Sequence, residues 1–396
     1  QVRSAVLNSY EKTPMCGGGI RKGKRMYTEQ DLVRVARREN NKKRSYLVVN
    51  RLQGKHIPVK PGEALAMFRA LADKLRGLYE KETLLVIGFA ETATAIGAAV
   101  AAELGADYMQ TTRELVPDAA YLYFSEEHSH ATEQKLVRND IDSVVKSIDR
   151  ILFVEDEVTT GKTIQNIITI LKKQYSEKIK FSVASILNGM DKTALDAYGR
   201  SQIDLFWLVK TDHAAYAEIA QAYNEDGTYV RCKDGAQAGQ NGQVTMCSSK
   251  LKGRMDTRRI VHSAAYQKYC ASLYQDIAEQ IDFENAQKIL VLGTEEFMYP
   301  ALYVADRIEA RGNDVRFHAT TRSPIAVSSA ENYPFHTRYE LASFYDSSRT
   351  TYLYELQKYD MVVIITDAQG DTAAGMETLY RALAASGNER IYFFQL

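Results

Sequence analysis

The chain has 396 residues, of which 45% are hydrophobic and 25% charged, so it is long enough for about two to three soluble domains with sizeable cores. Its 50 basic and 50 acidic residues balance, which argues against bulk attraction to nucleic acid or an anionic membrane. No apolar run approaches a membrane span in length, and the first residues lack the apolar core of a signal peptide. The four cysteines are irregularly spaced without a C-x-x-C pair, so a zinc site has little support and we expect a reduced, cytoplasmic chain.

The first predicted element is a flexible N-terminal arm at residues 1–26, which is polar and rich in glycine. Its basic cluster at 21–25 is interpreted as a solvated charge run. Thr28 then begins a predicted helix, because Asp31 follows three residues later as in a capping box. We expect this helix to continue to Val35.

Two strand–loop–helix units come next. Their predicted parts are, in chain order, a strand at 46–49, the loop GKHIPV at 54–59, a helix at 62–79, a strand at 84–87, the loop Gly88-Phe89-Ala90-Glu91-Thr92-Ala93-Thr94, and a helix at 95–104. The second loop combines glycine, small residues and hydroxyls at a helix N-terminus. Backbone N–H groups and the helix dipole favour an anion at such a place, so this loop is a predicted anion site.

A strand at 107–110 leads to Thr111-Thr112-Arg113 and then to residues 115–135, which are predicted to be irregular. This span ends in the polar run SEEHSH at 125–130. Its imidazole and carboxyl groups could protonate a leaving group or activate a nucleophile, and His128 is the candidate. The same run is equally typical of a solvated hairpin tip.

The stretch Ile151–Thr163, ILFVEDEVTTGKT, carries the strongest chemical signal. Four apolar residues predict a buried strand of a parallel sheet, and the acids Glu155 and Asp156 follow at once. The loop Thr159-Thr160-Gly161-Lys162-Thr163 then precedes a helix with apolar periodicity. Outward-pointing N–H groups, the helix dipole and threonine hydroxyls make such a loop a phosphate cradle.

The loop is not a Walker A motif. That motif needs a first glycine five residues before Gly161, and this position holds Asp156. Two acids directly before a phosphate loop suit a sugar that carries one phosphate. The carboxylates would accept hydrogen bonds from two neighbouring ribose hydroxyls, while the loop holds the 5′-phosphate.

Residues 27–223 are predicted to form one domain, with further strands at 180–186 and 203–209 and a helix at 213–222. Residues 224–257, rich in Gly, Gln, Ser and Asn, are predicted to be a polar linker. Residues 258–396 are predicted to form a second α/β domain that begins with a helix at 258–281.

The second domain repeats features of the first. The segment ILVLG at 289–293 resembles LLVIG at 84–88, each is followed by a helix and a Thr-Thr-Arg, and Asp367 follows an apolar run as Asp156 does. A degenerate duplicated unit is one interpretation, and chance similarity of two parallel α/β units is the other. The sequence AQGDT at 368–372 replaces the threonine loop, and its aspartate would repel phosphate. We therefore expect this copy to bind something else or to be structural.

The stretch 151–163 closely resembles the 5-phosphoribosyl-1-pyrophosphate (PRPP) motif of type I phosphoribosyltransferases, with departures at Glu157, commonly apolar, and Lys162, often glycine. The strand, GKHIPV loop and helix at 46–79 resemble the opening of orotate phosphoribosyltransferases. Thr321-Arg322-Ser323-Pro324 resembles the signature of the TRSP domain. That domain follows a transferase domain in proteins encoded with bacterial tellurium-resistance and stress operons. The first half of the chain resembles this transferase domain as well, in the segments GKHIPV, GFAETATAIG and SEEHSHA.

The resemblance implies a type I fold, a central parallel sheet flanked by helices, with PRPP and Mg²⁺ as ligands. It implies that Glu155 and Asp156 hold the ribose hydroxyls and, indirectly, magnesium bound to PRPP. It assigns the 5′-phosphate to the loop 159–163, and it assigns a mobile hood to 115–135. For the pyrophosphate it implies contacts from Phe89, Ala90, Glu91, Thr92, Arg113 and Lys55. A carboxylate beside pyrophosphate is unusual, so Glu91 is either a contact to magnesium-bound water or a charge at a helix N-terminus.

The predicted function is therefore a magnesium-dependent phosphoribosyltransferase that transfers ribose 5-phosphate to an unidentified acceptor, in the synthesis of a nucleoside-like metabolite. The rival hypothesis is a PRPP- or nucleotide-sensing regulator with the same fold and no turnover. A PRPP-forming kinase relative is a weaker third, since the sequence has no adenine or triphosphate motif. We expect small-molecule substrates, no membrane or nucleic-acid partner, and a homodimer as family members commonly form.

Overall fold

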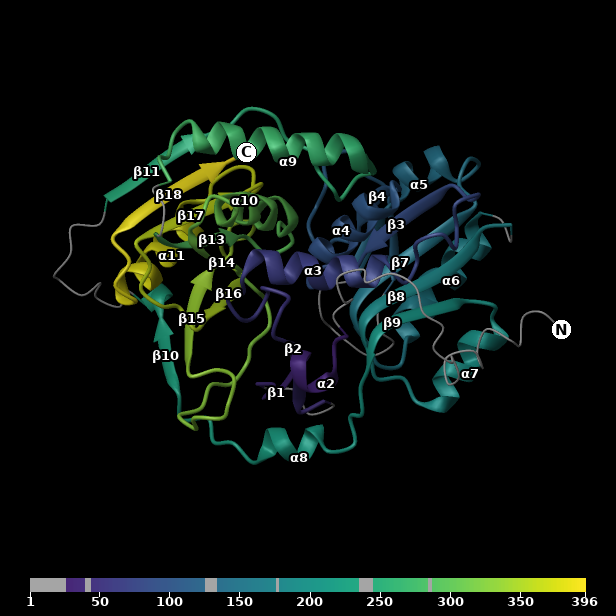
Figure 1. The fold of residues 1–396 in the computed structure, drawn as a ribbon, viewed down its shortest axis with the longest axis horizontal. Helices are drawn as coiled ribbons and strands as arrows, with labels where there is room; N and C mark the ends of the chain where they lie inside the picture. The colour runs from purple at the N-terminus through teal and green to yellow at the C-terminus, as the bar shows by residue number, and fades with distance from the viewer. Residues whose placement is uncertain (1–25, 40–43, 125–133, 176–177, 235–244, 284–286) are drawn as a thin grey trace, which may run out of the picture.

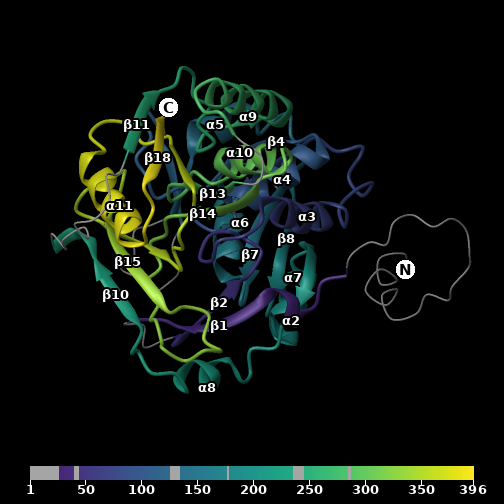
Figure 2. The ribbon, with the colours of Figure 1, turned by 60° about the vertical axis from the view of Figure 1, so that its left-hand side comes forward.

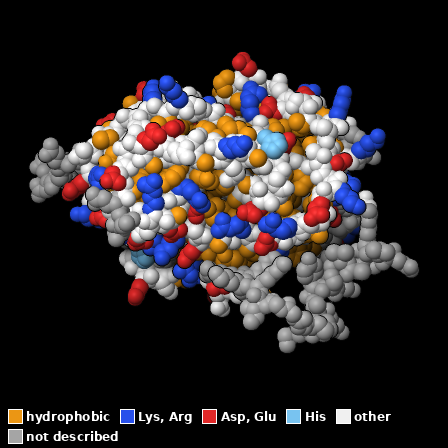
Figure 3. Space-filling model, turned by 45° about the horizontal axis from the view of Figure 1, so that its top comes forward, with side chains coloured by type: hydrophobic (Ala, Val, Ile, Leu, Met, Phe, Trp, Pro, Cys, Tyr) orange, Lys and Arg blue, Asp and Glu red, His pale blue; other side chains and the backbone are white. Residues whose placement is uncertain are grey.

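The computed structural model describes residues 26–39, 44–124, 134–175, 178–234, 245–283 and 287–396. It consists of two α/β halves that lie side by side, the first mainly purple to teal and the second green to yellow in Figure 1. Among these residues no helix is long and apolar enough to cross a membrane. Acidic and basic side chains are interspersed over the face drawn in Figure 3, which agrees with the balanced composition.

The first half is built on a six-stranded sheet in the order β12-β4-β3-β7-β8-β9. All neighbours are parallel except β12, which runs antiparallel to β4 and comes from the second half of the chain. The strands are β3 (Leu84–Gly88), β4 (Asp107–Gln110), β7 (Arg150–Val158), β8 (Lys180–Asn188), β9 (Asp204–Lys210) and β12 (Val261–His262). This arrangement confirms the expected α/β fold with a central, mostly parallel sheet.

Helices α3 (Pro61–Ala72) and α4 (Thr94–Leu104) pack on one face of this sheet. The chain also forms α5 (Arg138–Val144), α6 (Lys162–Gln174), α7 (Lys192–Arg200) and α8 (Tyr216–Gln221). Between β4 and β7, where an irregular span was predicted, β5 (Tyr121–Phe124) and β6 (Gln134–Val137) form an antiparallel hairpin. His128 lies outside the described residues.

The N-terminal helix is shorter than predicted. The capping box at Thr28 is present, but α2 covers only Glu29–Leu32 and the chain continues as β1 (Val33–Arg37). This strand pairs antiparallel with β2 (Tyr46–Asn50), and its Ala36 packs in a buried cluster with Ile325 of the second half. Long-range pairing of a β-branched segment thus overrides the local helix signal.

The second half is built on a five-stranded parallel sheet in the order β11-β18-β17-β13-β14. A small sheet, β10-β15-β16, lies beside it. The strands are β10 (Thr228–Arg231), β11 (Thr245–Lys250), β13 (Lys288–Gly293), β14 (Asp314–Ala319), β15 (Thr337–Ala342), β16 (Thr350–Tyr354), β17 (Met361–Thr366) and β18 (Arg390–Gln395). The helices are α9 (Ser263–Ala278), α10 (Tyr299–Glu309) and α11 (Ala373–Ala385).

Residues 224–257 differ from the predicted linker, because they supply β10 and β11 to these two sheets. The side chains of β11 are mostly exposed at the edge of the sheet, so its composition carries no apolar strand pattern. The predicted helix at 258–281 likewise begins later, as α9, after the short strand β12. The described part of this segment therefore contributes strands to the second half.

The two halves repeat one topology. The order β4-β3-β7-β8 in the first sheet has its counterpart in β14-β13-β17-β18, and each half inserts a hairpin, β5-β6 or β15-β16, at the same point. The main hydrophobic core is continuous across both halves, and it includes Phe68 and Ile96 of the first and Ile308 and Phe317 of the second. The repeated topology favours the interpretation as a duplicated unit.

Candidate functional site

The two predicted anion loops lie at the same edge of the first sheet. One follows β3 and the other follows β7, and these strands are parallel neighbours with Gly88 paired to Val154. The N–H of Phe89 donates to the carbonyl of Val154 at 3.0 Å, which ties the start of the first loop to the second strand. The structure therefore brings together the two loops that the sequence analysis assigned to one ligand.

The loop after β3 is held tightly. A Cβ on Gly88 would lie 2.9 Å from both the carbonyl oxygen of Ala93 and the hydroxyl of Tyr108, so only glycine fits. The Ala90 N–H donates to the Thr111 hydroxyl at 2.8 Å, and Phe89 packs against Phe153. The loop is thus fixed in place before any ligand arrives.

The loop after β7 depends on a glycine as well. Gly161 precedes α6 with φ of 69°, in the left-handed region, and its carbonyl accepts a 2.6 Å hydrogen bond from the Tyr198 hydroxyl. Thr160 and Lys162 are exposed beside it. The N-cap residues of α4 and α6 make no side-chain cap, and in the first turn of α6 the Lys162 N–H donates only a long, 3.4 Å hydrogen bond to the Thr160 hydroxyl, so backbone N–H groups at both helix starts suit an anionic ligand.

The acidic residues belong to β7 itself, which runs on to Val158. The carboxyl groups of Glu155 and Asp156 lie within hydrogen-bond distance of each other, so the two acids form a close pair. Burial and repulsion from Asp156 raise the pKa of Glu155 well above its ordinary value. Glu157 accepts two hydrogen bonds from Arg44, at 2.8 and 3.0 Å, which explains a carboxylate where an apolar residue is common.

Lys55 is a link between the two halves. It is fully buried, and its ammonium lies 2.7 Å from Glu91, 2.5 Å from the Glu295 carbonyl oxygen and 2.8 Å from the Thr320 carbonyl oxygen. A lysine has three donors, so none is left for a pyrophosphate oxygen. This placement differs from the predicted contact to pyrophosphate.

Glu91 is committed to the same link. Besides Lys55, it accepts a 3.2 Å hydrogen bond from the Arg322 N–H of the second half. Burial alone would raise the pKa of Glu91, but the charges of Lys55 and Arg322 outweigh it and lower that pKa. The carboxylate is therefore ionised and paired within the protein, and because it stands just before α4 the role as a charge at a helix N-terminus stays a prediction.

Comparison with known families decides what this site belongs to. Residues 32–218 match the family described as "Phosphoribosyl transferase", and residues 253–383 match the "TRSP domain C terminus to PRTase_2". The chain is a phosphoribosyltransferase domain followed by a TRSP domain. A search of curated proteins found no match.

Several solved adenine phosphoribosyltransferases are similar to part of the chain. The enzyme from Rhodothermus marinus is 17% identical over 46% of this chain and 96% of its own, with a TM-score of 0.33. The enzyme from Thermoanaerobacter pseudethanolicus is 19% identical over 46% and 97%, with a TM-score of 0.32. The Trypanosoma brucei enzyme, in complex with AMP, pyrophosphate and ribose-5-phosphate, is 16% identical over 38% and 65%, with a TM-score of 0.28.

Arg113 of the phosphoribosyltransferase domain was predicted to contact pyrophosphate. It follows β4 directly, it is partly exposed, and it is close enough to Glu91 to help lower the pKa of that carboxyl group. Its backbone N–H donates to Glu296 of the TRSP domain at 2.9 Å. The backbone of Arg113 is thus positioned by the second half.

His56 is a site residue that the sequence analysis did not single out. Its side chain is buried, and neither ring nitrogen has a hydrogen-bond partner among the described residues. Burial and the charge of Lys55 lower its pKa to about 4, so the ring is neutral, and Asp156 is among the charges that act on it. The signal available in the sequence was its place beside Lys55 in the GKHIPV segment.

A cavity of about 500 Å³ opens at the carboxyl ends of β8 and β9. It is lined by Glu29, Gly189, Met190, Asp191, Lys210, Thr211, Asp212, His213 and Ala214. The Nε2 atom of His213 lies 3.5 Å from Glu157, so the cavity adjoins the acidic part of β7. Its walls carry charges of both signs, which suits a polar small molecule.

Proposed function

We propose that the phosphoribosyltransferase domain binds PRPP between the loops 88–94 and 159–163 and transfers its ribose 5-phosphate to a polar acceptor. The observation that carries this proposal is the juxtaposition of two helix N-termini that lack an N-cap side chain, each following one of two neighbouring parallel strands, together with an acidic pair on one of these strands. Two separate anion sites flanking carboxylates match a ligand with a phosphate at one end, a pyrophosphate at the other and ribose hydroxyls in the middle.

In this reaction the bond between C1 of the ribose and a pyrophosphate oxygen breaks, and a bond from C1 to the acceptor forms. Glu155 and Asp156 hold the ribose hydroxyls, and the negative charge of this pair stabilises positive character on the ring. The 159–163 loop fixes the 5′-phosphate, while the 88–94 loop and Arg113 receive the leaving pyrophosphate. The acceptor enters from the cavity beside Glu157.

Magnesium belongs to this proposal as an ion carried by PRPP. Carboxylate oxygens such as those of Glu155 and Asp156 are the donors that Mg²⁺ prefers, together with substrate phosphates and water. Among the described residues no group of three or more histidine, cysteine or acidic side chains could hold a metal unaided. When bound, the ion would neutralise charge on the pyrophosphate.

The experiment is release of pyrophosphate from PRPP and Mg²⁺ by the full chain, with and without a panel of nucleobases and other polar acceptors. Release that depends on an acceptor, and that Asp156→Asn abolishes, supports the transferase. Tight PRPP binding with no release across the panel would support a sensing role and refute turnover.

A further inference from the structure

The two halves are related residue by residue. Gly88 and Gly293 end β3 and β13 in the same position, because Thr111 N–H donates to the Gly88 carbonyl at 2.9 Å and Thr320 N–H to the Gly293 carbonyl at 3.2 Å. The next turn also repeats. The Ala90 N–H donates to the Thr111 hydroxyl, and the Glu295 N–H donates to the Thr320 hydroxyl. Glu91 therefore corresponds to Glu296, and Arg113 to Arg322.

Corresponding residues contact one another across the boundary in a reciprocal way. The Arg322 N–H donates to Glu91 at 3.2 Å, and the Arg113 N–H donates to Glu296 at 2.9 Å. When residue i of one unit contacts j of the other, and j contacts i in return, the two units are related by a two-fold axis. This pair of contacts lies at the loop proposed to hold the pyrophosphate.

A second reciprocal pair lies on the edge strands. Val59, two residues before α3, forms an antiparallel bridge with Phe317 on β14. Val261, two residues before α9, pairs antiparallel with Tyr108 on β4. Tyr108 and Phe317 occupy the same register in their own sheets, because each stands two positions before the residue paired with the terminal glycine.

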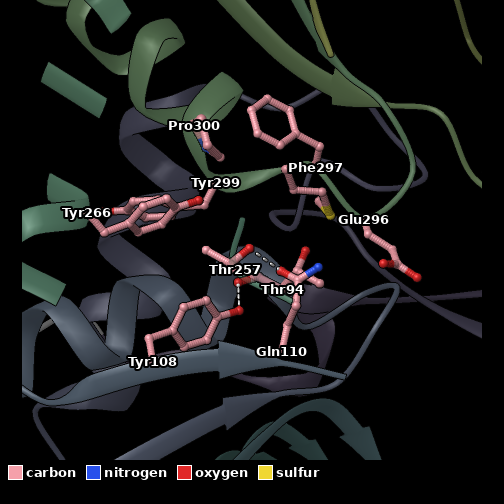
Figure 4. Close-up of a pocket in the computed structure, with 10 residues that line it drawn as sticks. Thr94, Tyr108, Gln110, Thr257, Tyr266, Glu296, Phe297, Tyr299 and Pro300 are labelled. Atoms are coloured by element: carbon pink, nitrogen blue, oxygen red, sulfur yellow. Dashed lines mark hydrogen bonds between the residues drawn. The ribbon is translucent and has the colours of Figure 1, made fainter. Parts of the chain in front are cut away.

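The helices between the sheets follow the same rule. In the two halves α3 corresponds to α9 and α4 to α10, and the contacts across the boundary are α3 with α10, α4 with α9, and α4 with α10 (Figure 2). Figure 4 shows Thr94 and Tyr108 of the first half facing Tyr299 and Phe297 of the second. The space between them has no room for a water molecule, so the halves are closely packed.

We propose that the TRSP domain is a built-in second subunit. The two halves form a two-fold dimer within one chain, and the TRSP half holds the 88–94 loop and Arg113 in their working positions. The chain then functions as a monomer, because the surface a second copy would use is already covered. Only the expected effect on PRPP affinity rests on the proposed function.

The two halves differ at the ligand position. Asp367 corresponds to Asp156, but the Arg258 guanidinium lies 2.6 Å from it and the Tyr345 hydroxyl 2.5 Å, so its oxygens are taken. Arg258 stands three residues before Val261, as His56 stands three before Val59. An arginine therefore fills in the second half the place that neutral His56 leaves open in the first. This makes the second half a support for the site rather than a second site.

The first measurement is the mass of the full chain by sedimentation equilibrium at micromolar concentration. The internal dimer predicts the mass of one chain, and a stable homodimer would overturn it.

The second experiment uses the variant Glu296→Gln, which weakens the hydrogen bond between the TRSP half and the backbone of Arg113. We expect the affinity for PRPP with Mg²⁺ to fall about tenfold in calorimetry, within the usual range of coupling between sites. Amide hydrogen exchange of the segment around Arg113 should accelerate. Glu377→Gln on the exposed face of α11 is the matched control and should change neither. An unchanged affinity and unchanged exchange in Glu296→Gln would overturn the proposal.

Glu296 also contacts Arg258, so this variant could unfold. Thr257→Val is the second variant, because the Thr257 hydroxyl donates to Gln110 across the boundary at 2.8 Å and valine keeps its shape. It should accelerate exchange at Gln110, and unchanged exchange there counts against the proposal. If the wild-type chain binds no PRPP, the proposed function fails, while the mass and exchange results still decide the internal dimer.

Discussion

Replacing Lys55 by methionine separates a structural link from a pyrophosphate ligand. The substitution keeps the length of the side chain but leaves the buried Glu91 carboxylate without its cation. It also removes the hydrogen bonds that Lys55 donates to two carbonyl oxygens of the second half. Removing one partner of a buried ion pair costs about 3–5 kcal/mol of unfolding free energy. With an unfolding entropy of about 2.1 cal/mol/K per residue, the melting temperature of this chain should fall by about 4–6 °C.

Differential scanning calorimetry provides the assay, and we expect one transition because a single core runs through both halves. The matched control is Lys192→Met on the exposed surface, which should leave the melting temperature unchanged. Adding Glu91→Gln to Lys55→Met should recover part of the loss, because the orphaned charge is removed. A Lys55→Met protein that melts like the wild type but no longer binds PRPP would refute the reasoning and restore Lys55 as a ligand.

Three further predictions concern the first half. Gly161→Ala should lower the melting temperature and weaken PRPP binding, because φ is positive there and a Cβ would lie 2.4 Å from the Tyr198 hydroxyl; equal melting and affinity in calorimetry would contradict this. The raised pKa of Glu155 means that the folded protein binds the proton of this carboxyl group more tightly than the unfolded chain does. The contribution of Glu155 to the free energy of unfolding should therefore fall as the pH rises from the ordinary glutamate range towards the raised pKa. Melting curves of Glu155→Gln against wild type should diverge with rising pH, the variant being the more stable at pH 7, and parallel curves would count against it. His56→Asn should weaken PRPP affinity about fivefold, which corresponds to the loss of one hydrogen bond of about 1 kcal/mol. His336→Asn, whose ring contacts Glu355 of the second half, is the control and should leave the affinity unchanged.

Much of the first half could be predicted from sequence because its signals are local. An apolar strand, a glycine turn and a helix start lie within a dozen residues of each other in 84–104 and in 151–174, and both units formed at the expected places. Parallel neighbours then place their loops at one edge of the sheet without further information.

The errors arose where distant residues decide the outcome. Val33 begins a strand because β2 pairs with it and Ile325 covers that hairpin, neither of which the helix cap at Thr28 reveals. Lys55 was predicted to contact pyrophosphate because the sequence does not reveal its partners, the carbonyl oxygens of Glu295 and Thr320, which the other half supplies. The Thr-Thr-Arg repeat predicted two similar units, but a repeat does not say how the copies touch.

The central claim is that the first half holds PRPP between two anion loops and an acidic pair. Isothermal titration of the full chain with PRPP in the presence of Mg²⁺ tests it most directly, alongside Asp156→Asn and the exposed control Asp196→Asn. The account predicts one PRPP per chain for the wild type and for Asp196→Asn, and a marked loss of affinity for Asp156→Asn. Two PRPP molecules per chain, no binding by the wild type, or equal affinity in Asp156→Asn would contradict it.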